Sequence, residues 1–117
     1  MSISSEFGRW WKATDACLLL PSHFTMNVIG EWFITDKTNN RIRKVDSEGI
    51  ITTVVGGGDS DEDGQATMVR VYQPEGVAVL PSGELLIADL LYQRIRRVDR
   101  NGYMEAIAGG GSAIASS

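Results

Sequence analysis

Short stretches rich in apolar residues, separated by Gly, Pro, Asn and Asp, recur along the chain and predict β-strands. In the second half they cover residues 76–79, 84–89, 94–99 and 103–109, with turns at 81–83 and 100–102. In the first half the corresponding stretches are 24–29, 31–36, 41–46 and 50–56. Apolar residues dominate both alternating sets in 32–35 and 85–88, which predicts strands covered on both faces. Gly, Pro and β-branched residues interrupt every window long enough for a helix.

The two halves are copies of one unit. The stretch EWFITDKTNNRIRKVDSEGIITTVVGGG from Glu31 aligns with ELLIADLLYQRIRRVDRNGYMEAIAGGG from Glu84, an offset of 53 residues. Residues 19–58 lie over residues 72–111 without a gap, and fourteen of the forty aligned positions are identical. Average composition alone would give roughly two or three identities. The repeat is therefore genuine.

The last turn of each copy has the residues that a tight hairpin needs. Gly49 and Gly102 fall where the backbone requires a positive φ, and Asp46 and Asp99 stand where their carboxylates can accept hydrogen bonds from the turn. A small eight-stranded sandwich would also use such hairpins. It gives no reason for two four-stranded units to share a sequence, whereas a propeller repeats the same sheet from blade to blade.

At DKTNNRIRKVDSEGIITTVVGGG the sequence resembles the NHL-repeat family, whose blades carry an Asp, an Asn-rich link, RI and then VD..G. The second copy keeps the pattern, with Tyr92 and Gln93 in place of the asparagines. The resemblance covers about residues 19 to 111. It implies an NHL-type β-propeller, usually six-bladed, whose loops at one end of the ring present a binding surface. The expected fold is all-β: a partial β-propeller of two four-stranded antiparallel blades.

The domain organisation follows from the repeat. Residues 19–58 form the first blade, 59–71 an acidic connector, 72–111 the second blade and 112–117 a frayed tail. Residues 1–18 have no counterpart in the repeat and are either a strand of a preceding blade or an unrelated cap. Two blades alone leave large apolar faces open. We therefore expect further blades in the same protein or other copies of the chain, and an isolated chain that oligomerises or aggregates.

Composition narrows the classes of function. The chain has 117 residues, a formal net charge of -4 and a pI near 4.9, which argues against non-specific binding to polyanions. Cys17 is its one cysteine, so an intrachain disulfide is excluded, and we expect Cys17 to be a small buried hydrophobe. Residues 1–20 are interrupted by charges and lack the apolar stretch of a signal peptide. The cytoplasm is the default expectation.

The acidic connector contains Asp59, Asp61 and Asp63 in a DxDxDG pattern, which is the first half of a calcium loop. A complete EF-hand loop has a bidentate acid at its twelfth position, where this chain has Arg70. We therefore favour a solvated connector over a calcium site. No cofactor is expected.

Basic residues recur on the third strand of each copy, namely Arg41, Arg43, Lys44, Arg94, Arg96 and Arg97. One interpretation is a stripe that binds RNA. We favour a structural one, because a buried guanidinium needs a carboxylate. The residues Asp36 and Arg41 bracket one hairpin link, and Asp89 and Arg94 bracket its copy, so each pair is predicted to form an ion pair.

Residues for catalysis are few. His23 is the single histidine, and Glu31 and Glu84 are expected to be solvated turn carboxylates. No enzyme activity is predicted. Trp32 and Phe33 are expected in the core, and Tyr92, in an exposed link, is the aromatic residue expected to touch a partner. The predicted function is a non-catalytic scaffold for protein interaction. The alternatives are an RNA-binding module and an incomplete propeller hydrolase or lyase.

Overall fold

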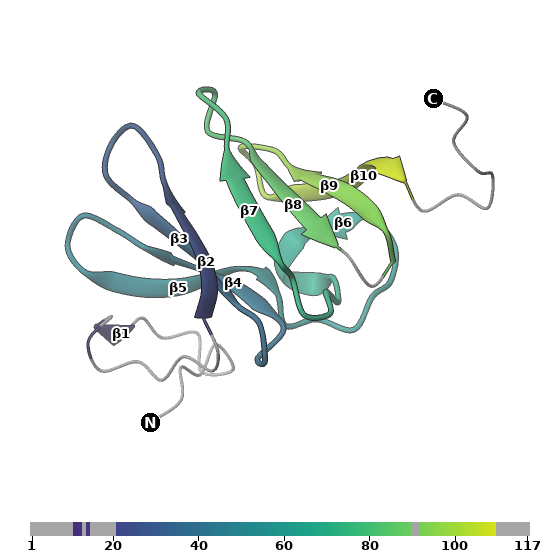
Figure 1. The fold of residues 1–117 in the computed structure, drawn as a ribbon, viewed down its shortest axis with the longest axis horizontal. Helices are drawn as coiled ribbons and strands as arrows, with labels where there is room; N and C mark the ends of the chain where they lie inside the picture. Colours follow the sequence, from purple (N-terminus) through teal and green to yellow (C-terminus); the bar gives the residue numbers. More distant parts are fainter. Residues whose placement is uncertain (1–10, 13, 15–20, 90–91, 110–117) are drawn as a thin grey trace.

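The computed structural model describes residues 11–12, 14, 21–89 and 92–109, which form two antiparallel sheets (Figure 1). The first sheet has the strand order β1-β5-β4-β3-β2. Its strands are β1 (Trp11–Lys12), β2 (Pro21–Met26), β3 (Trp32–Asp36), β4 (Arg41–Val45) and β5 (Ile50–Gly56). The predictions for Cys17 and for residues 112–117 lie outside the described residues.

The second sheet repeats the first, with the strand order β6-β10-β9-β8-β7. Its strands are β6 (Gly64–Gln65), β7 (Gly76–Val79), β8 (Leu85–Asp89), β9 (Arg94–Val98) and β10 (Tyr103–Gly109). A short 3-10 turn, η3 (Ala66–Met68), follows β6. The all-β prediction is confirmed. Within the described ranges no helix is long and apolar enough to cross a membrane.

Each sheet has a fifth, two-residue strand that the sequence repeat did not include. Lys12 of β1 pairs with Ile50 of β5, and Gln65 of β6 pairs with Tyr103 of β10, so the two short strands have the same register at the offset of 53 residues. The strand β6 is part of the connector between the blades. The equivalence between the two halves therefore reaches back to Trp11, within the segment for which the sequence showed no counterpart.

The hairpins follow the predicted turn chemistry. Asp46 Oδ1 accepts hydrogen bonds from the backbone nitrogens of Glu48 and Ile50, and Asp99 Oδ1 accepts the equivalent bonds from Asn101 and Tyr103, all between 2.9 and 3.0 Å. The pairing of β4 with β5 and that of β9 with β10 also contain a β-bulge at the same repeat position. The two sheets therefore agree in local detail as well as in topology.

One prediction of strand extent is wrong. The strand predicted over 24–29 is Pro21–Met26 in the structure. It ends at Met26 because Asn27 begins a turn in which its Oδ1 accepts hydrogen bonds from the backbone nitrogens of Ile29 and Glu31. An asparagine that bonds to its own local backbone competes with strand pairing.

The core lies between the two sheets. Phe33, Ile42 and Val55 of the first sheet belong to the same buried cluster as Leu85 and Ile87 of the second. Because side chains alternate along a strand, Trp32 points to the opposite face from Phe33. Trp32 is 39% exposed, so the prediction that both belong to the core is correct for Phe33 and wrong for Trp32. No sheet covers that outer face in the described part of the chain.

Strands β2 and β7 lie side by side where the two sheets meet (Figure 1). Three polar contacts join the sheets in this region. His23 Nε2 lies 3.2 Å from the carbonyl oxygen of Val77. Lys37 forms an ion pair with Glu75, and Asn40 Oδ1 accepts a hydrogen bond from the backbone nitrogen of Gln73 at 2.8 Å. The link between β3 and β4, the link between β8 and β9 and the connector between the blades therefore lie at one end of the molecule.

Candidate functional site

A buried ion pair fixes the link between β3 and β4. Asp36 lies opposite Arg41 in the strand pairing, yet its Oδ2 atom accepts the hydrogen bonds of Arg43 Nε, at 3.0 Å, and of Asn39 Nδ2, at 2.8 Å. The predicted Asp36–Arg41 pair is thus replaced by Asp36–Arg43. Arg43 lies two residues further along the same face, where its long side chain also reaches Thr53. Burial lowers the pKa of the Arg43 guanidinium, and the bond to Asp36 opposes this shift.

The second blade varies this arrangement. Arg94 Nε donates to Asp89 Oδ2 at 3.4 Å, which is the Asp89–Arg94 contact expected from the sequence. Arg96, the equivalent of Arg43, is fully buried, and none of its three guanidinium nitrogens has a hydrogen-bond acceptor among the described residues. The position equivalent to Thr53 is Ala106, which offers no hydroxyl group. Burial lowers the pKa of Arg96.

The acidic connector supplies a charge in place of that missing acceptor. Asp63 Oδ1 lies 3.6 Å from Arg96 Nη2 and accepts a hydrogen bond from the backbone nitrogen of Ala106 at 3.2 Å. Asp89 Oδ2 lies 3.9 Å from Arg96 Nη1. Two carboxylates therefore flank the buried guanidinium, one from its own sheet and one from the connector. Sequence reasoning did not assign this role to Asp63.

A second arginine, Arg70, contacts another aspartate of the DxDxDG segment. Asp61 binds Arg70 through two hydrogen bonds of 3.0 Å, which raise the pKa of the Arg70 guanidinium. Asp61 and Asp63 thus contact different partners, and the described residues contain no group of three ligands arranged around a metal position. The calcium alternative at Asp59, Asp61 and Asp63 gains no support from this geometry.

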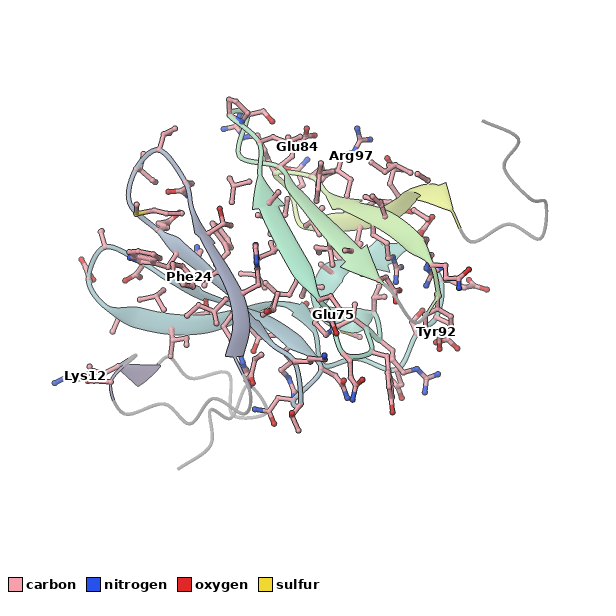
Figure 2. The ribbon with its side chains drawn as sticks, viewed as in Figure 1. Lys12, Phe24, Glu75, Glu84, Tyr92 and Arg97 are labelled. Carbon is pink, nitrogen blue, oxygen red and sulfur yellow. The ribbon has the colours of Figure 1, made fainter. Side chains whose placement is uncertain are left out.

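Two concave regions open at opposite ends of the sheets. The link-end pocket, of about 500 Å³, lies where the links of both blades meet the connector. Its lining residues are Asn39, Asn40, Arg41, Gly57, Gly58, Arg70, Val71, Tyr72 and Tyr92. Figure 2 shows Tyr92 at this end together with Glu75, and Glu84 and Arg97 at the other.

The second region is a groove of about 690 Å³ between the sheets at the turn end. Phe33, Lys44 and Val54 line it from the first sheet, and Leu85 and Val98 from the second. Glu31, at the rim, lies 3.6 Å from Lys44 and also accepts a hydrogen bond from Asn27. This groove is a widening of the core between two blades, and two of its charged residues, Glu31 and Lys44, pair with each other.

The predicted contact residue Tyr92 lies in the link-end pocket and is 43% exposed. Its ring packs beneath the guanidinium of Arg94, 5.0 Å from ring centre to Cζ. Arg41, predicted as a structural partner of Asp36, forms part of the pocket wall instead. Tyr92 replaces an asparagine of the first copy, and this departure from the repeat was the signal available in the sequence.

The sequence and the fold of this chain were compared with those of known proteins. No family model matches the chain. The protein SUPPRESSOR OF QUENCHING 1, chloroplastic, of Arabidopsis thaliana is 30% identical over 74 residues, which are 62% of this chain and 7% of that protein. Virginiamycin B lyase from Staphylococcus aureus has a TM-score of 0.61 at 15% identity, over 89% of this chain and 31% of that one. A streptogramin B lyase has a TM-score of 0.54 at 19% identity, over 75% and 26%.

These likenesses show the fold: the two sheets are arranged as neighbouring blades of a β-propeller. This chain spans less than a third of the length of either solved lyase. The prediction that it is not an enzyme is contradicted, because both solved proteins are lyases. That prediction relied on the few catalytic residue types in 117 residues. A ring assembles its functional loops from several blades, so two blades need not contain a complete set.

Proposed function

We propose that this chain supplies consecutive blades of an NHL-type β-propeller that acts as a scaffold for binding another protein. The observation that carries the proposal is the match between its two outer sheet faces. The outer face of the second sheet carries Leu86 and Ile95, and Ile95 is 43% exposed. These residues are the repeat equivalents of Phe33 and Ile42, which form the face that the first sheet packs against the second.

The outer face of the first sheet is the complementary one. It carries Phe24, 63% exposed, whose ring lies 5.4 Å from that of Trp32. Their repeat equivalents, Val77 and Leu85, are buried beneath the first sheet. One face of each kind is thus used in the existing contact. On the two remaining faces Phe24, Trp32 and Ile95 are exposed, whereas Arg43 and Ile51, on the same face as Trp32, are buried. A further blade of the same type fits either end by the same contact, and repetition forms a ring where the rotation between blades closes.

Loops carried by rigid strands are where propellers place their binding residues. In this chain the links of both blades and the connector meet at the link-end pocket, with Tyr72 and Tyr92 at its rim. Tyr and Arg are enriched at the centres of protein interfaces. These observations support a protein partner at the link end, as the resemblance to the NHL family implies.

The test uses two variants, each of which damages one outer face. Trp32→Glu places a charge on the first face and Ile95→Glu on the second. Sedimentation velocity over a wide range of protein concentrations should show association of the unmodified chain. Each variant alone should sediment as a monomer or weak associate, whereas an equal mixture should form a defined dimer, because one intact face of each kind remains.

Met68→Glu is the matched control, because Met68 is exposed in η3 and lies outside both outer faces. It should associate like the unmodified chain. Circular dichroism establishes that all variants remain folded. An unmodified chain that stays monomeric, or a mixture that behaves as two separate monomers, would refute the complementary faces and with them the ring.

A lyase is the second candidate, favoured by the two solved lyases that share the fold. The link-end pocket would then lie among the loops that bind the substrate. Incubating the ring-forming assembly with virginiamycin B and following the intact compound by mass spectrometry tests this candidate. Consumption that depends on the protein supports lyase activity, and an unchanged amount of the compound argues against this substrate.

A further inference from the structure

Arg41 is a cation in the wall of the link-end pocket whose hydrogen-bonding capacity is only partly used. Its Nη1 atom donates to the carbonyl oxygen of Asn39 at 3.0 Å. Its Nε atom is buried and has no acceptor within the described part of the chain. A guanidinium carries five N–H donors in a planar fork. Arg41 therefore retains donors for a ligand.

The backbone beside Arg41 fixes the position of the guanidinium. Gly57 has a φ of +94°, and a Cβ atom on this residue would lie 3.2 Å from Arg41 Nε and 3.5 Å from Nη2. The guanidinium thus packs closely against the glycine backbone, and a side chain at this position would have to displace it slightly. Asn40 and Gln73 are joined by a hydrogen bond at the same end, which ties the link of the first blade to the start of the second blade. Donor groups that are held in place before binding lose less entropy when they bind.

The remaining lining residues are suited to a peptide. Tyr72 and Tyr92 are exposed, and each presents an apolar ring with a polar hydroxyl group. Arg70, on the same wall, is held by Asp61 through both of its hydrogen bonds, which leaves Arg41 as the cation with an unfilled buried donor in this pocket. A volume of about 500 Å³ is in the ordinary range for a binding site.

We infer that the link-end pocket binds an acidic side chain of a protein partner, with Arg41 binding the carboxylate. The rings of Tyr72 and Tyr92 pack against the residues that flank this side chain. A carboxylate matches the planar fork of a guanidinium and forms strong, charge-assisted hydrogen bonds with it. The inference rests on the proposed scaffold function and adds the chemistry of the partner and the residues that recognise it.

A nucleic acid fits these observations less well. A polyanion binds through several free cations, and the chain has a net charge of -4. The basic residues of β4 and β9 are largely paired: Arg43 with Asp36, Lys44 with Glu31, Arg94 with Asp89 and Arg97 with Glu105. One guanidinium at a pocket wall, without a carboxylate partner among the described residues, suits one carboxylate.

The test is a titration of the isotope-labelled chain followed by NMR. The probe is the peptide acetyl-Tyr-Glu-Tyr-amide, and its control is acetyl-Tyr-Gln-Tyr-amide, which has the same shape without the charge. We expect the acidic peptide to shift the side-chain Nε–H of Arg41 and the amides of Asn40, Gly57 and Tyr92 in a saturable manner. The neutral peptide should bind at least about tenfold more weakly, because the charged hydrogen bonds are lost.

Variants separate the site from general charge effects. Arg41→Gln should weaken binding of the acidic peptide about tenfold or more, whereas Arg100→Gln, the same change at the exposed turn end, should leave it unchanged. Tyr92→Ser, at an exposed position, provides a second variant that leaves the arginine in place and should also weaken binding. Equal binding of both peptides, or equal effects of Arg41→Gln and Arg100→Gln, would overturn the inference.

Two further arms distinguish the remaining outcomes. A single-stranded RNA oligonucleotide that shifts the same resonances more strongly than the acidic peptide would replace the proposed ligand by a nucleic acid. Sedimentation of Arg41→Gln should match that of the unmodified chain. Lost peptide binding with intact association therefore assigns the failure to the pocket, whereas lost association in the unmodified chain assigns it to the ring.

Discussion

Replacing Asp63 by asparagine should destabilise the second sheet, because this carboxylate lies beside a guanidinium that is fully buried. Asp63 Oδ1 is 3.6 Å from Arg96 Nη2, and Arg96 has no hydrogen-bond acceptor among the described residues. The first sheet needs no such group from a connector, because Thr53 lies opposite Arg43 and accepts a hydrogen bond from it. Asp63→Asn leaves the shape of the side chain nearly unchanged and removes its charge.

The magnitude follows from distance and exposure. At an effective dielectric constant of about 20, two unit charges 3.6 Å apart attract each other by about 4–5 kcal/mol. The Asp63 side chain is 44% exposed, so water screens much of this attraction, and we expect Asp63→Asn to lower the free energy of unfolding by about 1–2 kcal/mol. Ala106→Thr places a hydroxyl group opposite Arg96 and should restore about 1 kcal/mol in that background.

The assay is urea unfolding followed by circular dichroism, on the unmodified chain, both single variants and the double variant. Asp59→Asn is the control, because it removes the same charge from the same connector without facing Arg96. The double variant should be more stable than Asp63→Asn alone. If Asp63→Asn costs no more than Asp59→Asn, or if Ala106→Thr brings no recovery, Asp63 is not the counterion of Arg96.

Three further predictions concern the backbone and are measured as shifts in thermal unfolding. Gln93→Asn should raise stability by about 0.5–1 kcal/mol, because Gln93 has a φ of +54° and asparagine adopts this conformation more readily; a loss of stability would contradict this reasoning. Gly109→Ala should cost about 2 kcal/mol or more, because a Cβ atom would lie 2.2 Å from the carbonyl oxygen of Gln93, whereas Gly64→Ala meets no atom within 4 Å and should be close to neutral. Asp99→Ala removes the acceptor of two turn hydrogen bonds and should cost about 1–2 kcal/mol; an unchanged melting temperature would show that the turn does not need its aspartate.

The sequence predicted the sheets well where short-range chemistry decides the structure. Strand β4 begins at Arg41 and strand β9 at Arg94, as the two RIR motifs indicate. The carboxylates of Asp46 and Asp99 accept hydrogen bonds from the backbone of their turns, as predicted. These features depend on residues a few positions apart, and the repeat provides two independent examples of each.

The sequence did not predict which groups meet across longer distances. The spacing of Asp36 and Arg41 indicated one hairpin, but the bonded arginine is Arg43, because burial and the Thr53 hydroxyl group favour the position two residues along. A strand within residues 1–18 was one of two alternatives, and its position at Trp11–Lys12 was not predicted, because a two-residue strand has no periodicity of its own. The position of Arg41 in the pocket wall likewise depends on how the link packs against the connector and Gly57.

The two faces of each sheet differ, and in the contact between the sheets one kind of face packs against the other kind. A row of such sheets therefore has a direction. Under the proposed function, duplication of one 53-residue unit in the gene adds a sheet whose two faces already match the sheets on either side. An insertion that cuts a unit in the middle of a sheet instead breaks hydrogen bonds within that sheet. Gain or loss of whole repeats therefore disturbs such a protein least. A substitution on a covered face needs a compensating substitution only in the neighbouring sheet.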